Sequence, residues 1–246
     1  MNIRSKALST LLVLSSQIRL SMSWRSSGNS NAELVTNMKK NGLFSSNRVG
    51  EAMLAVDRGD FTNNNPYEDR PQTIGFNATI SAPHMHAAAL EALKDHFVAG
   101  ANALDVGSGS GFLAACMAQM VGPNRTVVGI EHIPQLVEMS KKNVAKHHRN
   151  LLENQNLILV EGDGRLGYPS KAPYMAIHVG AAAKEIPPQL IEQLAEGGRM
   201  VIPVEKSVGE QYFLQVEKVN GQVRQKAIES VIYVPLTSRE KQLGIE

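Results

Sequence analysis

The 246-residue chain has little cysteine, little net charge and no long apolar run, and each shortage excludes a class of protein. A single cysteine, Cys116, allows no intramolecular disulfide and fits a reducing compartment, so we expect a cytoplasmic protein. The formal charge is +2, but residues 1–22 hold three basic groups and no acid, which leaves 22 basic against 23 acidic groups elsewhere. A nucleic-acid-binding protein usually carries a clear excess of basic groups, which residues 23–246 do not have.

The first 22 residues, MNIRSKALSTLLVLSSQIRLSM, differ in composition from the rest of the chain. Their short apolar run lies between basic flanks and is rich in serine, which is typical of a weak secretory signal or a transit peptide. The alternative, which we favour, is a disordered extension that an upstream start adds before Met22. The run is too short to span a membrane, so we expect no membrane partner.

Cap and turn residues divide the N-terminal part of the chain into helices and a loop. Ser30 or Asn31 caps a predicted helix over AELVTNMKKNG, and a second helix is predicted from Ser46 through NRVGEAMLAVD. Residues 59–71 are predicted as loop, because GDFTNNNPYEDRP holds three asparagines and two prolines. After the uncharged stretch IGFNATISAP, apolar residues at helical spacing predict a helix over residues 84–97.

From residue 101 onward, strands and helices alternate. Strands are predicted over ANALDVGS, TVVGIEH, LILVEGDG, YMAIHVGA and RMVIPVE, with helices over FLAACMAQMVG, PQLVEMSKKNVAKHH and PPQLIEQLAEGG. A hairpin is predicted around Asn220-Gly221, followed by a final strand over VIYVPL. This order predicts an α/β fold: a Rossmann-like, doubly wound, mostly parallel sheet with N-terminal helices and a C-terminal β-hairpin.

A glycine-rich turn, LDVGSGSG, follows the first of these strands and opens a helix. Its glycines at 107, 109 and 111 do not meet the dinucleotide pattern G-x-G-x-x-G, because position 112 is phenylalanine. The Gly-Lys-Ser/Thr of a Walker A loop is missing as well. Asp105, just before the turn, favours a ligand with a charged amino-acid end over a pyrophosphate.

Acidic residues also end the next two strands. Glu131 closes TVVGIE, where a carboxylate can accept hydrogen bonds from both ribose hydroxyls of an adenosine. Asp163, in GDG, can accept from the adenine amino group. Each acid alone could be a solvated strand end, but three at successive strand ends of one sheet favour a shared ligand. Adenosine joined to a charged amino acid is S-adenosylmethionine, which we predict as the cofactor.

The segments LDVGSGSG, GIEH, GDGR and IHVGAAA, in this order and spacing, resemble the protein-L-isoaspartate (D-aspartate) O-methyltransferases. ATISAPHMHA is the segment that distinguishes that family from other methyltransferases, and NPYEDRPQTIGF and IYVPLTSREKQ are similar to further family segments. The likeness covers residues 22–246. It implies a single methyltransferase domain over residues 23–246, with the class I adenosylmethionine-dependent methyltransferase fold. One departure is Met175, where the family often has aspartate.

The resemblance implies protein repair. Enzymes of this family methylate the free carboxylate of L-isoaspartyl and D-aspartyl residues in damaged proteins and peptides, and the ester collapses to a succinimide that reopens partly as L-aspartate. The resemblance implies Ser81 as the catalytic residue and Thr79, Ser81 and His86 as substrate contacts. The cofactor contacts that it implies are Ala78, Thr79, Ile80, Ser81, His86, Asp105, Gly107, Ser108, Gly109, Glu131, His132, Asp163, Gly164, Thr237 and Gln242.

The implied chemistry needs no general base. A carboxylate with a pKa of about 4 is ionised at neutral pH and can attack the sulfonium methyl in line. Positioning of the two reactants can then lower the barrier by roughly 7–11 kcal/mol. A hydroxyl at Ser81 can orient the carboxylate without quenching it, whereas a lysine there would bind it too tightly and repel the sulfonium.

Other interpretations of the same residues are weaker. Ser81 as a hydrolase nucleophile lacks the G-x-S-x-G elbow, and His84 and His86 have no third metal ligand nearby, so we expect no metal. Cys116 lies among apolar residues and is predicted to be core. The triplet NPY at 65–67 resembles the N-P-P-Y signature of amino-group methyltransferases but precedes the glycine turn. Two rival functions stay open: a methyltransferase of RNA or a small molecule, and a non-catalytic adenosylmethionine-binding module.

Overall fold

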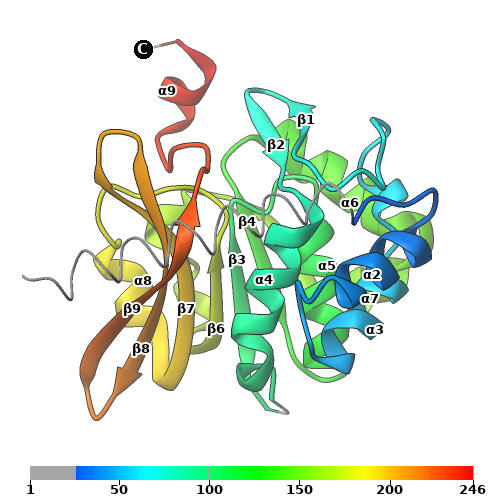
Figure 1. The fold of residues 1–246 in the computed structure, drawn as a ribbon. Coiled ribbons are helices and arrows are strands. Elements are labelled where there is room, and N and C mark those ends of the chain that lie inside the picture. Colours follow the sequence, from blue (N-terminus) through cyan, green and yellow to red (C-terminus); the bar gives the residue numbers. More distant parts are fainter. Residues whose placement is uncertain (1–25, 99, 246) are drawn as a thin grey trace, which may run out of the picture.

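The computed structural model describes residues 26–98 and 100–245, which fold around a seven-stranded sheet (Figure 1). In chain order its strands are β3 (Asn102–Val106), β4 (Val127–Glu131), β5 (Leu157–Glu161), β6 (Tyr174–Val179), β7 (Leu194–Ser207), β8 (Glu210–Val219) and β9 (Gln222–Val231). The spatial order is β5-β4-β3-β6-β7-β8-β9, in which the first five strands are parallel and the last two antiparallel. The chain therefore reverses its winding direction between β3 and β6, where open α/β sheets bind their ligands.

Helices cover both faces of the sheet. They are α2 (Asn31–Lys40), α3 (Asn47–Ala55), α4 (Pro83–Leu93), α5 (Phe112–Val121), α6 (Pro134–His147), α7 (Arg149–Glu153), α8 (Pro188–Gln193) and α9 (Arg239–Leu243). Within the described residues, short 3₁₀ turns lie between helices and strands: η1 (Arg58–Asp60), η2 (Lys94–His96), η3 (Gly164–Leu166) and η4 (Pro169–Lys171). Ser30 is the cap of α2, because its hydroxyl accepts from the Glu33 N–H.

Adjacent residues of the central strands point to opposite faces of the sheet and enter two separate cores. Ala103 and Val127 pack in the core that also holds Leu34, Leu90 and Leu113 of the N-terminal helices and α5. Their strand neighbours Leu104 and Val128 pack in the second core, which also holds Leu190 of α8. Strands that are covered on both faces are apolar throughout rather than alternating, which is the pattern that the sequence shows.

A second, two-stranded sheet lies at the end of the molecule where α9 also projects (Figure 1). Its strands β1 (Gln72–Gly75) and β2 (Ala78–Ile80) are antiparallel and were not predicted. Phe76 and Asn77 form the turn with φ of 53° and 55°, a backbone region that favours the turn types of tight hairpins. The hairpin delivers residues 78–81 to the carboxyl ends of the large sheet.

The predicted doubly wound, mostly parallel sheet with N-terminal helices and a C-terminal hairpin is confirmed. β6 forms with Met175 in it. The helices α7 and α9 were not predicted. The segment 1–22, predicted as a disordered extension, lies outside the described residues. Within the part of the chain that is described, no helix is both long and apolar enough to cross a membrane.

Two predictions near the C-terminus are wrong. The helix over residues 187–198 stops at Gln193, because Leu194 pairs with Tyr174 as the first residue of β7 and its side chain is buried in the core. A strand was also predicted over residues 231–236, but only Val231 belongs to a strand, as the last residue of β9. From there the chain leaves the sheet edge and crosses to the loop after β6, where Ala182 donates to the Val234 carbonyl at 2.8 Å.

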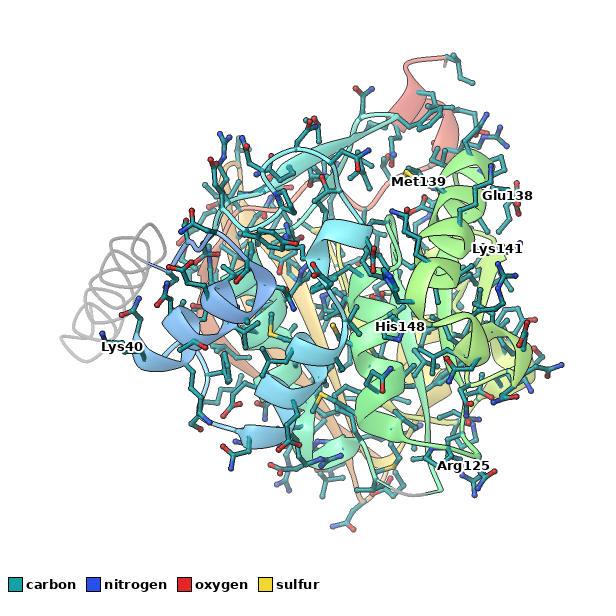
Figure 2. The ribbon with its side chains drawn as sticks, turned by 90° about the vertical axis from the view of Figure 1, so that its right-hand side faces the viewer. Lys40, Arg125, Glu138, Met139, Lys141 and His148 are labelled. Carbon is teal, nitrogen blue, oxygen red and sulfur yellow. The ribbon has the colours of Figure 1, made fainter. Side chains whose placement is uncertain are left out.

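One side of the molecule carries α6, whose outer surface is charged (Figure 2). Glu138 and Lys141 extend from this helix into solvent and form an ion pair of 2.8 Å, three residues apart. Such exposed pairs contribute little to stability. Glu138 and Lys141 therefore offer surface positions for control substitutions.

Candidate functional site

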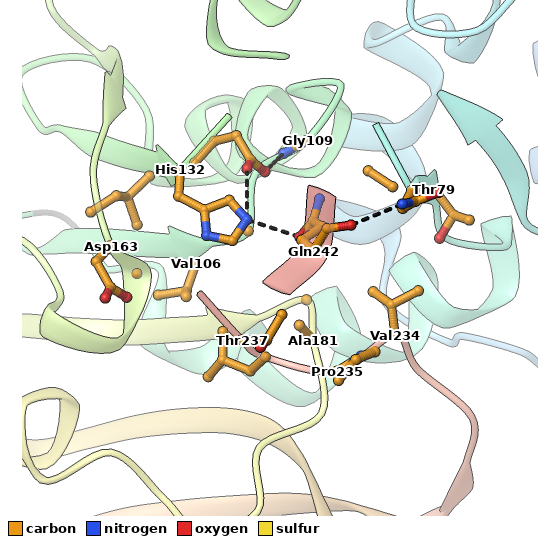
Figure 3. A pocket seen from close by; sticks show the side chains of 18 residues that line it. Thr79, Val106, Gly109, His132, Asp163, Ala181, Val234, Pro235, Thr237 and Gln242 are labelled. Atoms are coloured by element: carbon orange, nitrogen blue, oxygen red, sulfur yellow. Dashed lines mark hydrogen bonds and ion pairs between the residues drawn. The ribbon is translucent and has the colours of Figure 1, made fainter. Parts of the chain in front are cut away.

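A pocket opens at the carboxyl ends of β3, β4, β5 and β6, over the reversal of winding (Figure 3). Its walls come from the glycine-rich turn, the three strand ends that follow, the hairpin β1–β2 and the C-terminal segment. The lining residues are Asn77, Ala78, Thr79, Val106, Gly107, Gly109, Ile130, Glu131, His132, Asp163, Gly164, Gly180, Ala181, Val234, Pro235, Leu236, Thr237 and Gln242. Ten predicted cofactor contacts therefore line one pocket: Ala78, Thr79, Gly107, Gly109, Glu131, His132, Asp163, Gly164, Thr237 and Gln242. Ser81, a further predicted contact, directly follows β2, the strand that carries two of these ten.

The glycine-rich turn is a backbone structure that side chains would strain. Gly107, Gly109 and Gly111 have φ of 75°, 49° and 86°, the left-handed region that glycine adopts without cost. The N–H groups of Gly107 and Ser108 both donate to the Ile130 carbonyl, at 2.9 and 3.1 Å, which ties the turn to β4. Ser108 is buried and does not line the pocket. The turn thus presents bare backbone to whatever occupies the pocket.

Glu131 ends β4 with its carboxylate buried beside the pocket. Its Oε2 accepts from the Gly109 N–H at 3.2 Å and its Oε1 from the Ile133 N–H at 3.0 Å. Burial raises the pKa of this carboxyl, against the opposing effect of those backbone donors and of His132. Each oxygen keeps a further lone pair, so the side chain is held in place and can still accept from a ligand.

Asp105 lies beneath the glycine turn rather than on the pocket wall. Its Oδ1 is 2.7 Å from Nδ1 of His178 on the neighbouring strand β6, and both side chains are almost fully buried. The pair joins the two strands that flank the reversal of winding. The sequence placed Asp105 at the site but gave no sign of its partner His178, since strands 3 and 6 become neighbours only in the folded sheet.

Asp163 lines the far end of the pocket, next to η3. Both of its oxygens bind the Arg165 guanidinium, at 2.9 and 2.7 Å, and Arg165 lowers the pKa of the carboxyl. Asp163 is therefore ionised at neutral pH, and its orientation is fixed by a two-pronged contact. Arg165 is a partner that the sequence analysis missed.

The C-terminal segment forms one wall of the pocket. Gln242 of α9 binds His132 Nε2 through its Oε1 at 2.8 Å, as Figure 3 shows, and donates from Nε2 to the Phe76 carbonyl at 2.9 Å. Asn77 in turn donates from Nδ2 to the Gln242 carbonyl at 2.8 Å. One glutamine thus connects the residue that follows β4 to the turn of the hairpin β1–β2.

The stretch Ser81–His86 lies behind the pocket lining. Ser81 is half-buried, while Ile80 and His86 are buried, and none of the three lines the pocket itself. His86 faces Arg58, whose Nη1 donates to its Nδ1 at 3.3 Å, and its ring centroid is 5.2 Å from that of Phe112. Burial, reinforced by Arg58, holds the pKa of His86 well below its usual range, so the imidazole is neutral.

The pocket lining is acidic and contains no arginine or lysine: its titratable side chains are Glu131, Asp163 and His132. Such a lining complements a cationic ligand. Among residues 26–98 and 100–245, no three His, Cys, Asp or Glu side chains gather as they would around a metal ion.

Comparison with known proteins agrees with this geometry. The family model described as protein-L-isoaspartate(D-aspartate) O-methyltransferase matches residues 29–241. A Caenorhabditis elegans protein-L-isoaspartate O-methyltransferase is 64% identical over 221 residues, which cover 90% of this chain and 98% of that one. A Triticum aestivum protein of the same name is 51% identical over 217 residues, covering 87% and 94%.

Solved structures give the same result. A Plasmodium falciparum protein-L-isoaspartate O-methyltransferase in complex with S-adenosyl-L-homocysteine superposes with a TM-score of 0.81 at 35% identity, covering 85% of this chain and 99% of that one. The family model spans most of the chain, and full-length relatives share half or more of its residues. The chain therefore belongs to the protein-L-isoaspartate (D-aspartate) O-methyltransferase family.

Proposed function

We propose that residues 23–246 form one methyltransferase domain that moves a methyl group from S-adenosylmethionine to the free carboxylate of L-isoaspartyl and D-aspartyl residues in damaged proteins and peptides. One observation carries this proposal. The acidic side chains at the strand ends line the same pocket as the hairpin β1–β2, whose second strand leads directly into Ser81. Family membership supports the same reaction.

The pocket residues fit the cofactor. Glu131 would accept from the ribose hydroxyls, Asp163 from the adenine amino group, and Gly107 and Gly109 would let the backbone approach the amino-acid end. The acidic lining without arginine or lysine suits a ligand that carries a sulfonium and an ammonium group. Asp105, buried against His178, would act by fixing the turn and by its negative charge below it.

When bound, the cofactor supplies an electrophilic methyl group, whose carbon forms a bond to a carboxylate oxygen while the electrons of the S–CH₃ bond stay on sulfur. The protein has to hold the carboxylate in line and exclude water. Thr79 and Ser81 would orient the carboxylate by hydroxyl hydrogen bonds, and His86, neutral and buried, would support that wall. No side chain has to take a proton, because the carboxylate is already ionised.

The strap from Val234 to Gln242 would cover the bound cofactor. Thr237 and Gln242 line the pocket, and Gln242 spans it from His132 to Phe76. Closing a site in this way removes water and strengthens the electrostatic contacts inside it. Admission of the cofactor then requires the contacts of Gln242 to open.

For partners and location, we propose that damaged proteins and peptides are the macromolecular substrates, with no nucleic acid, membrane or metal involved, and that the protein is cytoplasmic. Support comes from the near-neutral charge of the chain beyond residue 22 and from the single Cys116, which is buried.

One assay tests the proposed reaction. Labelled S-adenosylmethionine is offered with an isoaspartyl peptide, with its normal aspartyl twin and with RNA, and the product is tested for a base-labile methyl group. Label only in the isoaspartyl peptide is the expected result. Label in RNA, or in no acceptor while the cofactor still binds, would favour one of the two rival functions.

The role of Ser81 is tested by Ser81→Ala. Loss of one hydrogen bond to a charged group costs roughly 1.5–3 kcal/mol, so kcat should fall about ten- to a hundredfold while cofactor affinity stays nearly constant. Ser170→Ala, an exposed serine in η4, is the matched control. Wild-type kcat in Ser81→Ala would leave the hydroxyl without a part in catalysis.

A further inference from the structure

Two buried charged side chains lie behind the wall Ser81–His86. Arg58, from η1, is 0% exposed, and Asp69, from the loop before β1, is 5% exposed. Neither lines the pocket, and no motif of the sequence analysis includes a role for them. Burying a charge is costly unless it is paired and hydrogen-bonded, so each of the two requires an explanation.

Arg58 holds the backbone at the residue that is proposed to orient the substrate. Its Nη2 donates to the Ser81 carbonyl at 2.8 Å, and its Nη1 donates to His86 Nδ1 at 3.3 Å. The guanidinium carbon lies 5.4 Å from the ring centroid of Phe112, the first residue of α5. One planar group thus fixes the peptide plane that follows Ser81 and the side chain of His86, the fourth residue of α4.

Asp69 holds the same segment from its other end. The helix α4 begins at Pro83, and its N-cap residue, Ala82, has no side chain that could cap the free N–H groups of the first turn. Asp69 caps it instead, from 15 residues upstream: its Oδ1 accepts from the His84 N–H at 2.9 Å and lies 2.8 Å from His84 Nδ1.

The element that carries Arg58 is itself rigidly attached. Asp57 caps η1 by accepting from the Gly59 N–H at 2.8 Å and also accepts from the Tyr67 hydroxyl at 2.9 Å. A side chain at Gly59 would meet that hydroxyl at 2.7 Å. The Arg58 N–H donates to Asn31 of α2 at 3.4 Å. The guanidinium is thus aimed at Ser81 by a folded support and not by a mobile loop.

We propose that Arg58 is a positioning residue for methyl transfer, which holds the Ser81 backbone so that the hydroxyl meets the attacking carboxylate. The inference rests on the proposed function of the Ser81 wall. Stability alone does not account for Arg58, because buried ionic groups can often be replaced by apolar residues of similar volume without loss. Arg58 Nε and Asp69 Oδ2 are buried and have no hydrogen-bond partner among the described residues. The two side chains are thus oriented toward residues 81–86 even though this leaves one polar atom of each without a hydrogen bond.

The test compares Arg58→Lys and Arg58→Met with wild type. Lysine keeps a charge and an apolar stem but lacks the planar fork that reaches both Ser81 and His86, and methionine keeps only the volume. Arg70→Met is the matched control, since Arg70 is exposed and pairs only with Glu68 among the described residues. The measurements are kcat and KM for an isoaspartyl peptide, the cofactor affinity by titration, the melting temperature, and amide hydrogen exchange over residues 78–90.

Both Arg58 variants are expected to lose kcat about ten- to a hundredfold, the effect of one hydrogen bond with a charged donor. Cofactor affinity should change less than twofold, because Arg58 does not line the pocket. Exchange of the Met85 and His86 amides, which donate to the Ala82 carbonyl at the start of α4, should become faster. Arg70→Met should behave as wild type in every measurement.

Wild-type kcat in either folded variant would overturn the proposal, as would a fall in kcat matched by an equal fall in cofactor affinity. If Arg58→Met does not fold, Arg58→Lys decides alone. Failure of the proposed function looks different: the wild type itself would not methylate the isoaspartyl peptide. The exchange measurement needs no substrate, so unchanged protection over residues 78–90 in Arg58→Lys would still refute the positioning role.

Discussion

Replacing Glu131 by glutamine changes one atom of the side chain and tests the cofactor site directly. The carboxylate oxygens of Glu131 each accept one backbone N–H, from Gly109 at 3.2 Å and from Ile133 at 3.0 Å. An amide offers one oxygen and one NH₂ group, so one of these two N–H groups would face a donor. The ribose hydroxyls would also lose a charged acceptor.

The magnitudes follow from those contacts. A hydrogen bond to a charged group is worth roughly 1.5–3 kcal/mol, so Glu131→Gln should weaken S-adenosylmethionine binding about ten- to a hundredfold. Leaving one buried N–H unpaired costs about 1–3 kcal/mol, but the variant also avoids burying a charge, the effect that raises the pKa of Glu131. The two opposing contributions should leave a fall in melting temperature of only a few degrees.

Isothermal titration with the cofactor, well below the melting temperature, separates binding from folding. Glu138→Gln on the outer surface of α6 is the control, because Glu138 is exposed (Figure 2), pairs with Lys141 and does not line the pocket. The affinity for the isoaspartyl peptide should move far less than that for the cofactor. A cofactor titration curve of Glu131→Gln that superposes on wild type would refute the ribose role.

The ribose role of Glu131 also predicts the direction in which cofactor affinity changes with pH. Burial raises the pKa of Glu131, so its carboxylate takes up a proton at a higher pH than an ordinary glutamate, which titrates near about 4.3. Cofactor affinity should therefore decline as the pH falls toward that raised value. The stability contribution runs the other way, because burial disfavours the ionised form: its cost shrinks as the pH falls through the raised folded-state pKa and is gone below the unfolded-state pKa. Both effects should be missing in Glu131→Gln.

Three further outcomes are expected. Gln242→Ala removes the contacts to His132 and Phe76, each worth about 0.5–1.5 kcal/mol, and should speed cofactor release roughly five- to a hundredfold in stopped-flow measurements; an unchanged rate would mean that the strap does not retain the cofactor. The kcat of the wild type should be flat from about pH 6 to 8, because the substrate carboxylate is ionised and His86 stays neutral, whereas a bell centred near 6.5 would implicate His84 or His86 as an acid–base group. Deleting residues 1–22 should leave kcat and melting temperature nearly unchanged, because these residues precede every motif, and a loss of several degrees would contradict that expectation.

The sequence by itself determined the cofactor half of the site. The alternation of strands and helices specifies a parallel sheet, and the ends of its strands necessarily meet at one edge. Gly107, Glu131 and Asp163 could therefore be assigned to one pocket without coordinates, because strand ends carry them and the order of elements places those ends together. Capping and glycine signals act within a few residues, which is why helices such as α2 and α5 were found near their true bounds.

Only the tertiary structure decided what holds the wall at Ser81 and what covers the pocket. Arg58, Asp69 and His178 act on partners 15 to 73 residues away, and an arginine or aspartate in a polar loop has no local signal that marks it as buried. The hairpin β1–β2 and the strap across to Gln242 depend on contacts 165 residues apart. Leu194 became strand instead of helix for the same reason, since pairing with Tyr174 outweighed a weak local helix preference. Local sequence signals therefore show which residues can contact a ligand, whereas contacts between distant parts of the chain determine where those residues are held.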